Sequence, residues 1–150
     1  MLKVGDPAPE IDLPASDGSR FRLSERRGKY TVLYFFPKAF TPGCTAETGC
    51  FRDSRGEIVA LGAEVVGISN DLPETQAKFA ESLHVDFPMV GDSTGKVIRA
   101  YGVAWPLLGI ARRATFVVGP TQTIEAVFWS ELNATKHIDD VTTFLKSKRA

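Results

Sequence analysis

Apolar residues follow one another along this chain in two patterns that alternate from segment to segment. Near-continuous runs of β-branched and aromatic residues predict strands covered on both faces, whereas apolar residues at three- and four-residue spacing predict helices with one buried side. We predict strands over 30–36, 63–69, 87–90, 115–118 and 123–129, and helices over 43–61, 73–83, 96–101 and 135–145. The run over 30–36 is expected to be a central strand, and it stops at Pro37.

Turn signals join these elements into one unit. Residues 11–13 and 21–23 alternate apolar and polar around the turn sequence 16–19, which predicts an N-terminal β-hairpin. A Gly-Pro turn at 119–120 joins the last two strands as a second hairpin. No repeat, linker or low-complexity stretch divides residues 1–150, so we expect a single α/β domain of three layers, α/β/α, around a central mixed sheet.

The composition narrows the class of protein. With 150 residues, 43% of them hydrophobic and 24% charged, the chain fits one soluble domain whose core needs neither metal nor disulfide. The 18 Lys and Arg balance the 18 Asp and Glu, so the basic surface of a nucleic-acid-binding protein is missing. We see no signal peptide and no stretch of about 20 apolar residues, so we expect no membrane partner and a cytoplasmic location, where cysteines are usually reduced.

Cys44 is the candidate reactive group, because it is expected in the first turn of the helix that follows the central strand. Unpaired backbone N–H groups and the positive end of the helix dipole favour an anion there, and the thiolate is the nucleophilic form of cysteine. Pro42 and Gly43 bring the backbone close to the sulfur, and Thr41 adds a hydroxyl, so a small polar molecule such as a peroxide can bind. The alternative is a small buried hydrophobic residue without chemistry.

In these residues the sequence resembles the peroxiredoxins. Pro37, Thr41 and Cys44 match the Pro-x-x-x-Thr-x-x-Cys motif of that family, and Arg113 lies where the family keeps its active-site arginine. The resemblance covers nearly the whole chain and is greatest to the Q or bacterioferritin-comigratory-protein branch; it includes segments 5–9, 34–37, 44–47, 51–53, 87–88 and 100–103. It implies a thioredoxin-like fold and a peroxidase that reduces hydrogen peroxide and small organic hydroperoxides without a bound cofactor.

The same resemblance implies a role for each residue of the site. The Cys44 thiolate attacks one oxygen of the peroxide and becomes a sulfenic acid, while Thr41 and backbone amides orient the substrate. Arg113 stabilises the thiolate and the charge that develops on the leaving oxygen, and Pro37 shields the sulfur from bulk water. The sulfenic acid must be reduced before a second peroxide oxidises it further, and thioredoxin or a related dithiol protein is the implied partner.

Cys50 departs from the family pattern. Relatives with a resolving cysteine in this helix usually keep four residues between the two cysteines, which here would be position 49, occupied by Gly49. Six residues of intact helix separate two Cα atoms by roughly 9 Å, whereas a disulfide needs about 4.4–6.8 Å. Either the helix unwinds and Cys50 resolves Cys44, helped by the weak helix former Gly49, or Cys50 is a half-buried filler and an external thiol serves a one-cysteine peroxidase.

Two further functions are compatible with the same cysteine. A general dithiol oxidoreductase usually has Cys-x-x-Cys at a helix start, whereas five residues separate Cys44 from Cys50. A non-enzymatic redox sensor would register oxidation without sustained turnover. His84 and His137 stand alone in the sequence, so we expect no metal site.

Other features leave more than one interpretation open. The apolar loop 105–110 is compatible with core filler, a wall of the peroxide entrance, a docking surface for a reductase, or a dimer face. Both a monomer and a homodimer therefore agree with the sequence. Glu47, in the first turn of the cysteine helix, fits a plain helix start as well as it fits a bond to Arg113.

Overall fold

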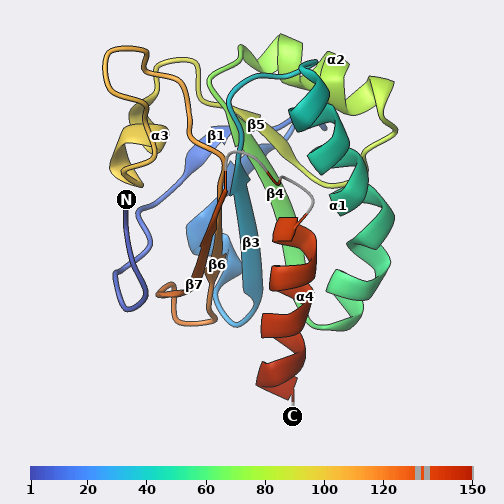
Figure 1. Cartoon of the computed structure of the whole chain (residues 1–150), viewed down its shortest axis with the longest axis vertical. Helices are drawn as coiled ribbons and strands as arrows, with labels where there is room; N and C mark the ends of the chain where they lie inside the picture. The colour runs from blue at the N-terminus through green and yellow to red at the C-terminus, as the bar shows by residue number, and fades with distance from the viewer. Residues whose placement is uncertain (131–132, 134–135, 150) are drawn as a thin grey trace.

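The computed structural model describes residues 1–130, 133 and 136–149. Its elements in chain order are β1 (Asp12–Pro14), β2 (Arg20–Arg22), a 3-10 helix (Leu23–Arg26), β3 (Tyr30–Phe35), α1 (Pro42–Ala60), β4 (Ala63–Ser69), α2 (Pro73–Ser82), β5 (Met89–Gly91), α3 (Lys96–Ala100), β6 (Ala114–Val118), β7 (Ile124–Trp129) and α4 (Lys136–Arg149) (Figure 1). Each helix and strand expected from the sequence is therefore confirmed, with shifts at the ends.

Five strands form the central sheet in the order β5-β4-β3-β6-β7. β3 pairs in parallel with β4 and antiparallel with β6, and β7 pairs antiparallel with β6. The mixed sheet and the central place of β3 are thus confirmed. β1 and β2 form a separate antiparallel pair, which is the predicted N-terminal hairpin.

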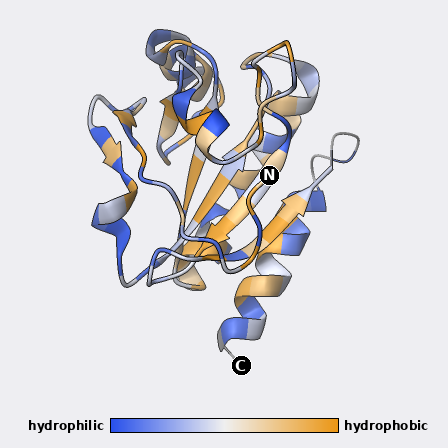
Figure 2. Ribbon diagram, turned by 90° about the vertical axis from the view of Figure 1, so that its left-hand side faces the viewer, coloured by the Kyte–Doolittle hydropathy of each residue, from blue (hydrophilic) through white to orange (hydrophobic). Residues whose placement is uncertain are grey.

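Both faces of the sheet are covered, which confirms the three-layer arrangement (Figures 1 and 2). Side chains of β3 alternate between the two faces. Phe35 packs in one cluster with Phe21 of the hairpin and Ile98 of α3, whereas Tyr34 packs in a second cluster with Phe51 of α1 and residues of α2 and α4. The sheet is therefore buried between α1, α2 and α4 on one side and α3 with the N-terminal segment on the other.

Two element ends differ from the sequence prediction by more than one residue, and each has a physical reason. β5 begins at Met89 and not at 87, because Pro88 has no N–H to donate to a neighbouring strand. α4 continues past Leu145 to Arg149, since its last turn is basic and cations are favoured at a helix C-terminus. Thr135, expected as the first residue of this helix, lies outside the described residues.

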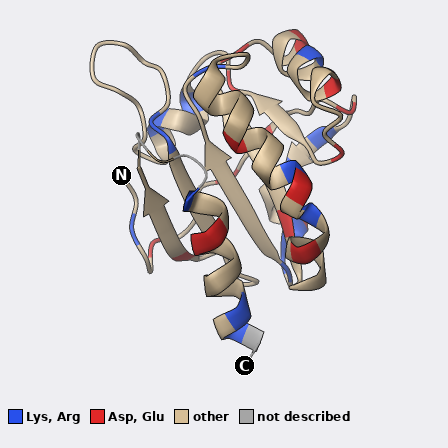
Figure 3. Cartoon of the chain, turned by 45° about the vertical axis from the view of Figure 1, so that its right-hand side comes forward, with Lys and Arg blue, Asp and Glu red and all other residues tan. Residues whose placement is uncertain are grey.

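Charged residues concentrate on helices and loops, while the sheet is mostly free of them (Figure 3). This distribution is typical of a sheet that is packed on both faces. Within the described part of the chain, no helix combines the length and the apolar content that a membrane span needs.

Candidate active site

β3 leads directly into the segment that carries Cys44. The chain leaves the sheet at Phe35, and α1 begins at Pro42, where a missing N–H is harmless because the first helical N–H groups have no partner within the helix. Thr41 is the N-cap residue, with an extended backbone (φ −78°, ψ 152°), so Cys44 lies in the first turn as predicted. The Cys44 side chain is 1% exposed. The positive end of α1 thus acts on a sulfur that is shielded from bulk water.

β6 brings Arg113 to the same place. Ala114, the first residue of β6, pairs with Phe35 at the end of β3, so Arg113 lies just beyond that edge of the sheet. Its Nη2 lies 3.4 Å from Cys44 Sγ, and its Nη1 donates to Glu47 Oε1 at 2.9 Å. Burial alone lowers the pKa of Arg113, but Glu47 and Cys44 outweigh it and raise the pKa above the usual value. A charged guanidinium therefore faces the sulfur directly.

The loop between β3 and α1 is fixed by two side chains. Thr41 Oγ1 donates to the carbonyl oxygen of Lys38 at 2.7 Å. The Ala39 N–H donates to Asp71 Oδ2 at 2.8 Å, and Ser69 Oγ donates to the same oxygen at 2.6 Å, so the end of β4 braces the loop. Because the Thr41 hydroxyl gives its proton to Lys38, its oxygen lone pairs are left to accept a hydrogen bond from a substrate.

Apolar residues accompany these polar contacts. Pro37 is half-buried at the start of the loop. Phe40 has a positive φ of 67° and is 54% exposed, with its ring centroid 5.1 Å from that of Phe79. In the apolar loop 105–110, Leu107 and Leu108 are exposed, so these two leucines are not core filler.

Cys50 lies in the same helix as Cys44, and both thiols are free. Its side chain packs half-buried against the cluster beneath α1, α2 and α4. Burial, together with Asp53, Glu47 and Asp139, raises the pKa of the Cys50 thiol. Since α1 is continuous through both positions, the two sulfurs cannot join while the helix is intact.

Two buried residues near Arg113 were missed or left open by the sequence. The sequence placed Glu47 in the first turn of α1, but it lies beyond that turn, is fully buried and bonds Arg113. Its spacing of three residues from Cys44 on one helix face was a usable signal. His137 of α4 is 1% exposed, and its Nδ1 lies 2.7 Å from Thr115 Oγ1 and 3.6 Å from Glu47 Oε2. No local pattern points to His137. Among the described residues, no group of three or more His, Cys, Asp or Glu could hold a metal ion.

The fold and the site together define a class of protein. A thioredoxin-like sheet, a buried cysteine in the first turn of the helix after the central strand, and an arginine on its sulfur are the features of thiol-dependent peroxidases. A family model described as the AhpC/TSA family matches residues 4–127, and the chain belongs to this family. It is a peroxiredoxin of the Q/Bcp type and has thiol-dependent peroxidase activity.

Known proteins of this type resemble the chain over nearly its full length. Peroxiredoxin Bcp of Escherichia coli (strain K12) is 36% identical over 152 residues, which span 97% of this chain and 96% of the relative. The crystal structure of peroxidoxin BcpB from Mycobacterium tuberculosis superposes with a TM-score of 0.93 at 37% identity, over 100% of both chains. A structure of the bacterioferritin comigratory protein of Xanthomonas campestris has a TM-score of 0.85 at 28% identity, over 93% of this chain and 92% of that one.

Proposed function

We propose that Cys44 is the peroxidatic residue of this peroxidase, and that hydrogen peroxide and small organic hydroperoxides are its substrates. The observation that carries the proposal is the buried contact of 3.4 Å between Cys44 Sγ and Arg113 Nη2 at the start of α1. A cation and a helix N-terminus that converge on one sulfur favour the thiolate, which is the nucleophile.

The first step forms a bond between Cys44 Sγ and the terminal oxygen of the hydroperoxide while the O–O bond breaks. The sulfur is oxidised to a sulfenic acid, and the peroxide is reduced to an alkoxide or hydroxide that takes up a proton and leaves as alcohol or water. Arg113 stabilises the negative charge as it moves from sulfur to the leaving oxygen. Thr41 accepts a hydrogen bond from the substrate, and Pro37 keeps water from the sulfur.

A relative and two apolar residues of this chain support organic hydroperoxides as substrates. The Xanthomonas campestris relative is described by its alkyl peroxide reduction activity. In this chain, the half-buried Pro37 and the exposed Phe40 give the loop before α1 an apolar character that suits a short alkyl group.

Cys50 is proposed as the resolving residue. Its sulfur attacks the sulfenic sulfur of Cys44, a disulfide forms, and hydroxide leaves as water after taking a proton. The step requires α1 to unwind between the two cysteines, and Gly49 weakens the helix at that point by about 1 kcal/mol relative to alanine. Thioredoxin or a similar dithiol protein then reduces the disulfide, which fits a reducing compartment such as the cytoplasm.

The test is a rapid-mixing experiment on Cys50→Ser. We expect it to consume one equivalent of hydrogen peroxide as fast as the wild type, because Cys44 and Arg113 are untouched. Sustained turnover with thioredoxin and its reductase should be lost, because the sulfenic acid is no longer converted to a disulfide. Mass spectrometry without reductant should show loss of two hydrogen atoms in the oxidised wild type and gain of one oxygen in the variant.

Cys44→Ser is the control, and it should not consume peroxide at all. Full steady-state turnover in Cys50→Ser would refute the resolving role and favour a one-cysteine peroxidase with an external thiol. Fast consumption by Cys44→Ser would overturn the peroxidatic assignment itself.

A further inference from the structure

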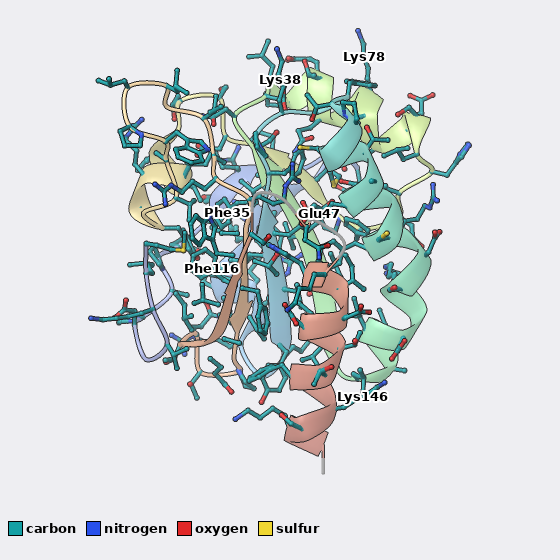
Figure 4. The ribbon with its side chains drawn as sticks, in the orientation of Figure 1. Phe35, Lys38, Glu47, Lys78, Phe116 and Lys146 are labelled. Atoms are coloured by element: carbon teal, nitrogen blue, oxygen red, sulfur yellow. The ribbon has the colours of Figure 1, made fainter. Side chains whose placement is uncertain are left out.

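The Arg113 guanidinium bonds a buried carboxylate, and that carboxylate is the first of a row of buried polar side chains from three elements. Its Nη1 donates to Glu47 Oε1 of α1 at 2.9 Å. The second carboxylate oxygen, Oε2, lies 3.6 Å from Nδ1 of His137 in the first turn of α4, and this nitrogen lies 2.7 Å from Thr115 Oγ1 of β6. Glu47 and Thr115 are fully buried, and His137 is 1% exposed. Figure 4 shows Glu47 between α1 and the start of α4.

Because Glu47 is buried, its contacts decide whether the charged carboxylate is stable there. A carboxylate removed from water must be compensated by charged or hydrogen-bonding neighbours, or it is strongly destabilised. Arg113 compensates one oxygen, and the imidazole of His137 faces the other. Contacts on both oxygens restrict the rotation of the carboxylate more than a contact on one oxygen does.

The position of the proton on His137 follows from the groups around it. A ring nitrogen that presented its lone pair to the Glu47 carboxylate would be repelled, so the carboxylate favours a proton on Nδ1. Thr115 Oγ1 then accepts the Nδ1–H hydrogen bond and orients the ring. The charged neighbours on α4, Lys136 and Asp140, pair with each other at 2.9 Å on a more exposed side of the helix.

We propose that His137 is a positioning residue for the peroxidase reaction. Its imidazole, oriented by the hydrogen bond to Thr115, lies against Glu47 Oε2 and holds the carboxylate at the angle that directs the Arg113 guanidinium onto Cys44 Sγ. The proposal rests on the proposed function, because it acts only through a reactive Cys44. It makes α4, far from Cys44 in the sequence, a part of the active site.

The test compares two substitutions of His137 in the Cys50→Ser background, where only Cys44 reacts. His137→Leu removes the N–H group, whereas His137→Asn keeps an N–H at about the position of Nδ1. We expect roughly tenfold to 100-fold slower oxidation by hydrogen peroxide in the leucine variant, as misplaced catalytic groups produce. Alkylation of Cys44 by iodoacetamide should slow as well, because a cation near the sulfur is displaced. The asparagine variant should oxidise within about threefold of the rate of its parent, and therefore clearly faster than the leucine variant.

A double-mutant cycle with Glu47→Gln separates positioning from a general loss of packing. If His137 acts through the Glu47 carboxylate, His137→Leu should change the oxidation rate by less than about twofold once that carboxylate is gone. Val141→Ala is the matched control: Val141 is fully buried in the same helix, but it is outside the polar contacts around Arg113. It should lower stability and leave Cys44 oxidation unchanged.

The oxidation rates of the parent and of the His137 variants distinguish a wrong positioning role from a wrong proposed function. Slow oxidation of the Cys50→Ser parent would overturn the proposed function. A fast parent with an equally fast His137→Leu variant would overturn the positioning role alone, as would equal losses in the leucine and asparagine variants or additive losses in the cycle. If His137→Leu does not fold, Thr115→Val removes the hydroxyl that orients the ring; wild-type oxidation in that variant would likewise overturn the role.

Discussion

At the scale of single residues, the proposed reactivity of Cys44 depends on how closely the Arg113 guanidinium approaches its sulfur. Gly43 sets that approach, because a Cβ atom at this position would lie 3.1 Å from Arg113 Nη2. That nitrogen is the one that faces Cys44 Sγ. A side chain at position 43 therefore competes for space with the donor on which the proposed chemistry rests.

Gly43→Ala should slow the oxidation of Cys44 without harming the fold. The added methyl group displaces the guanidinium by a few tenths of an ångström, so the rate should fall by about threefold to 10-fold. Alanine is a better helix former than glycine by about 1 kcal/mol, so the free energy of unfolding should not fall. Stopped-flow oxidation and urea unfolding measure the two effects separately.

Gly56→Ala in the same helix is the matched control. Nothing lies within 4 Å of a Cβ at position 56, so this variant should gain stability and react with peroxide as the wild type does. If Gly43→Ala also reacted at the wild-type rate, the Arg113 contact could not govern reactivity.

The sequence predicted part of this site and not the rest, for reasons of distance along the chain. Cys44 and Arg113 follow from a motif, a resemblance and the position of one helix start. Asp71 and His137 lack any such signal, because each acts by a tertiary contact with a segment far away in the sequence. A lone histidine is more often structural, and only the docking of α4 onto α1 reveals its neighbours.

At the scale of elements, the proposed resolution by Cys50 depends on α1, which holds both cysteines in one continuous helix. Unwinding between them also withdraws Glu47 from its contacts with Arg113 and His137. The proposed cycle therefore requires the first half of α1 to be stable enough to build the site and weak enough to open. Gly49 lies between the cysteines and lowers the cost of opening.

Gly49→Ala should slow disulfide formation and leave the first oxidation unchanged. A Cβ at position 49 meets only Arg52 Nη2, at 3.7 Å, so alanine fits without strain. The gain in helix stability is about 1 kcal/mol, which corresponds to roughly fivefold slower opening of this segment. Two successive phases of tryptophan fluorescence after mixing with peroxide would report oxidation and disulfide formation in turn.

Gly56→Ala serves here as well, because residue 56 lies beyond Cys50 in the part of α1 that need not unwind. It should leave both phases at the wild-type rate. Equal slowing of the second phase in both alanine variants would mean that the whole helix opens, and no slowing in Gly49→Ala would count against resolution by Cys50.

The elements themselves were predictable because their patterns are local. The apolar run of β3 and the spacing in α1 each identified their element without help from the rest of the chain. The ends were less predictable, since they depend on contacts and on backbone donors, as the start of β5 after Pro88 shows. The pairing order β5-β4-β3-β6-β7 depends on contacts between strands far apart in the sequence, so no local pattern predicts it.

The molecule as a whole buries a few ionisable groups outside the site, and their burial makes stability depend on pH. Asp92 follows β5 and is fully buried. Its Oδ2 accepts a hydrogen bond from the Ile98 N–H at 2.8 Å at the start of α3, while Oδ1 has no hydrogen-bond partner among the described residues. Burial raises the pKa of Asp92, and backbone N–H groups including that of Ile98 offset only part of this effect.

Asp92→Asn should therefore become more stable relative to the wild type as the pH rises. A carboxyl whose pKa is raised in the folded state is favoured there when protonated, so its contribution is present below the unfolded value of 3.8 and is lost as pH rises through the folded value. Asparagine does not titrate, so the difference in free energy of unfolding between variant and wild type should increase from acidic to neutral pH in urea titrations. Asp12→Asn should give the opposite trend, because a hydrogen bond from Arg20 lowers the pKa of Asp12 despite some desolvation. A difference for Asp92→Asn that stays flat or falls with pH would show that the buried carboxyl does not destabilise the fold at neutral pH.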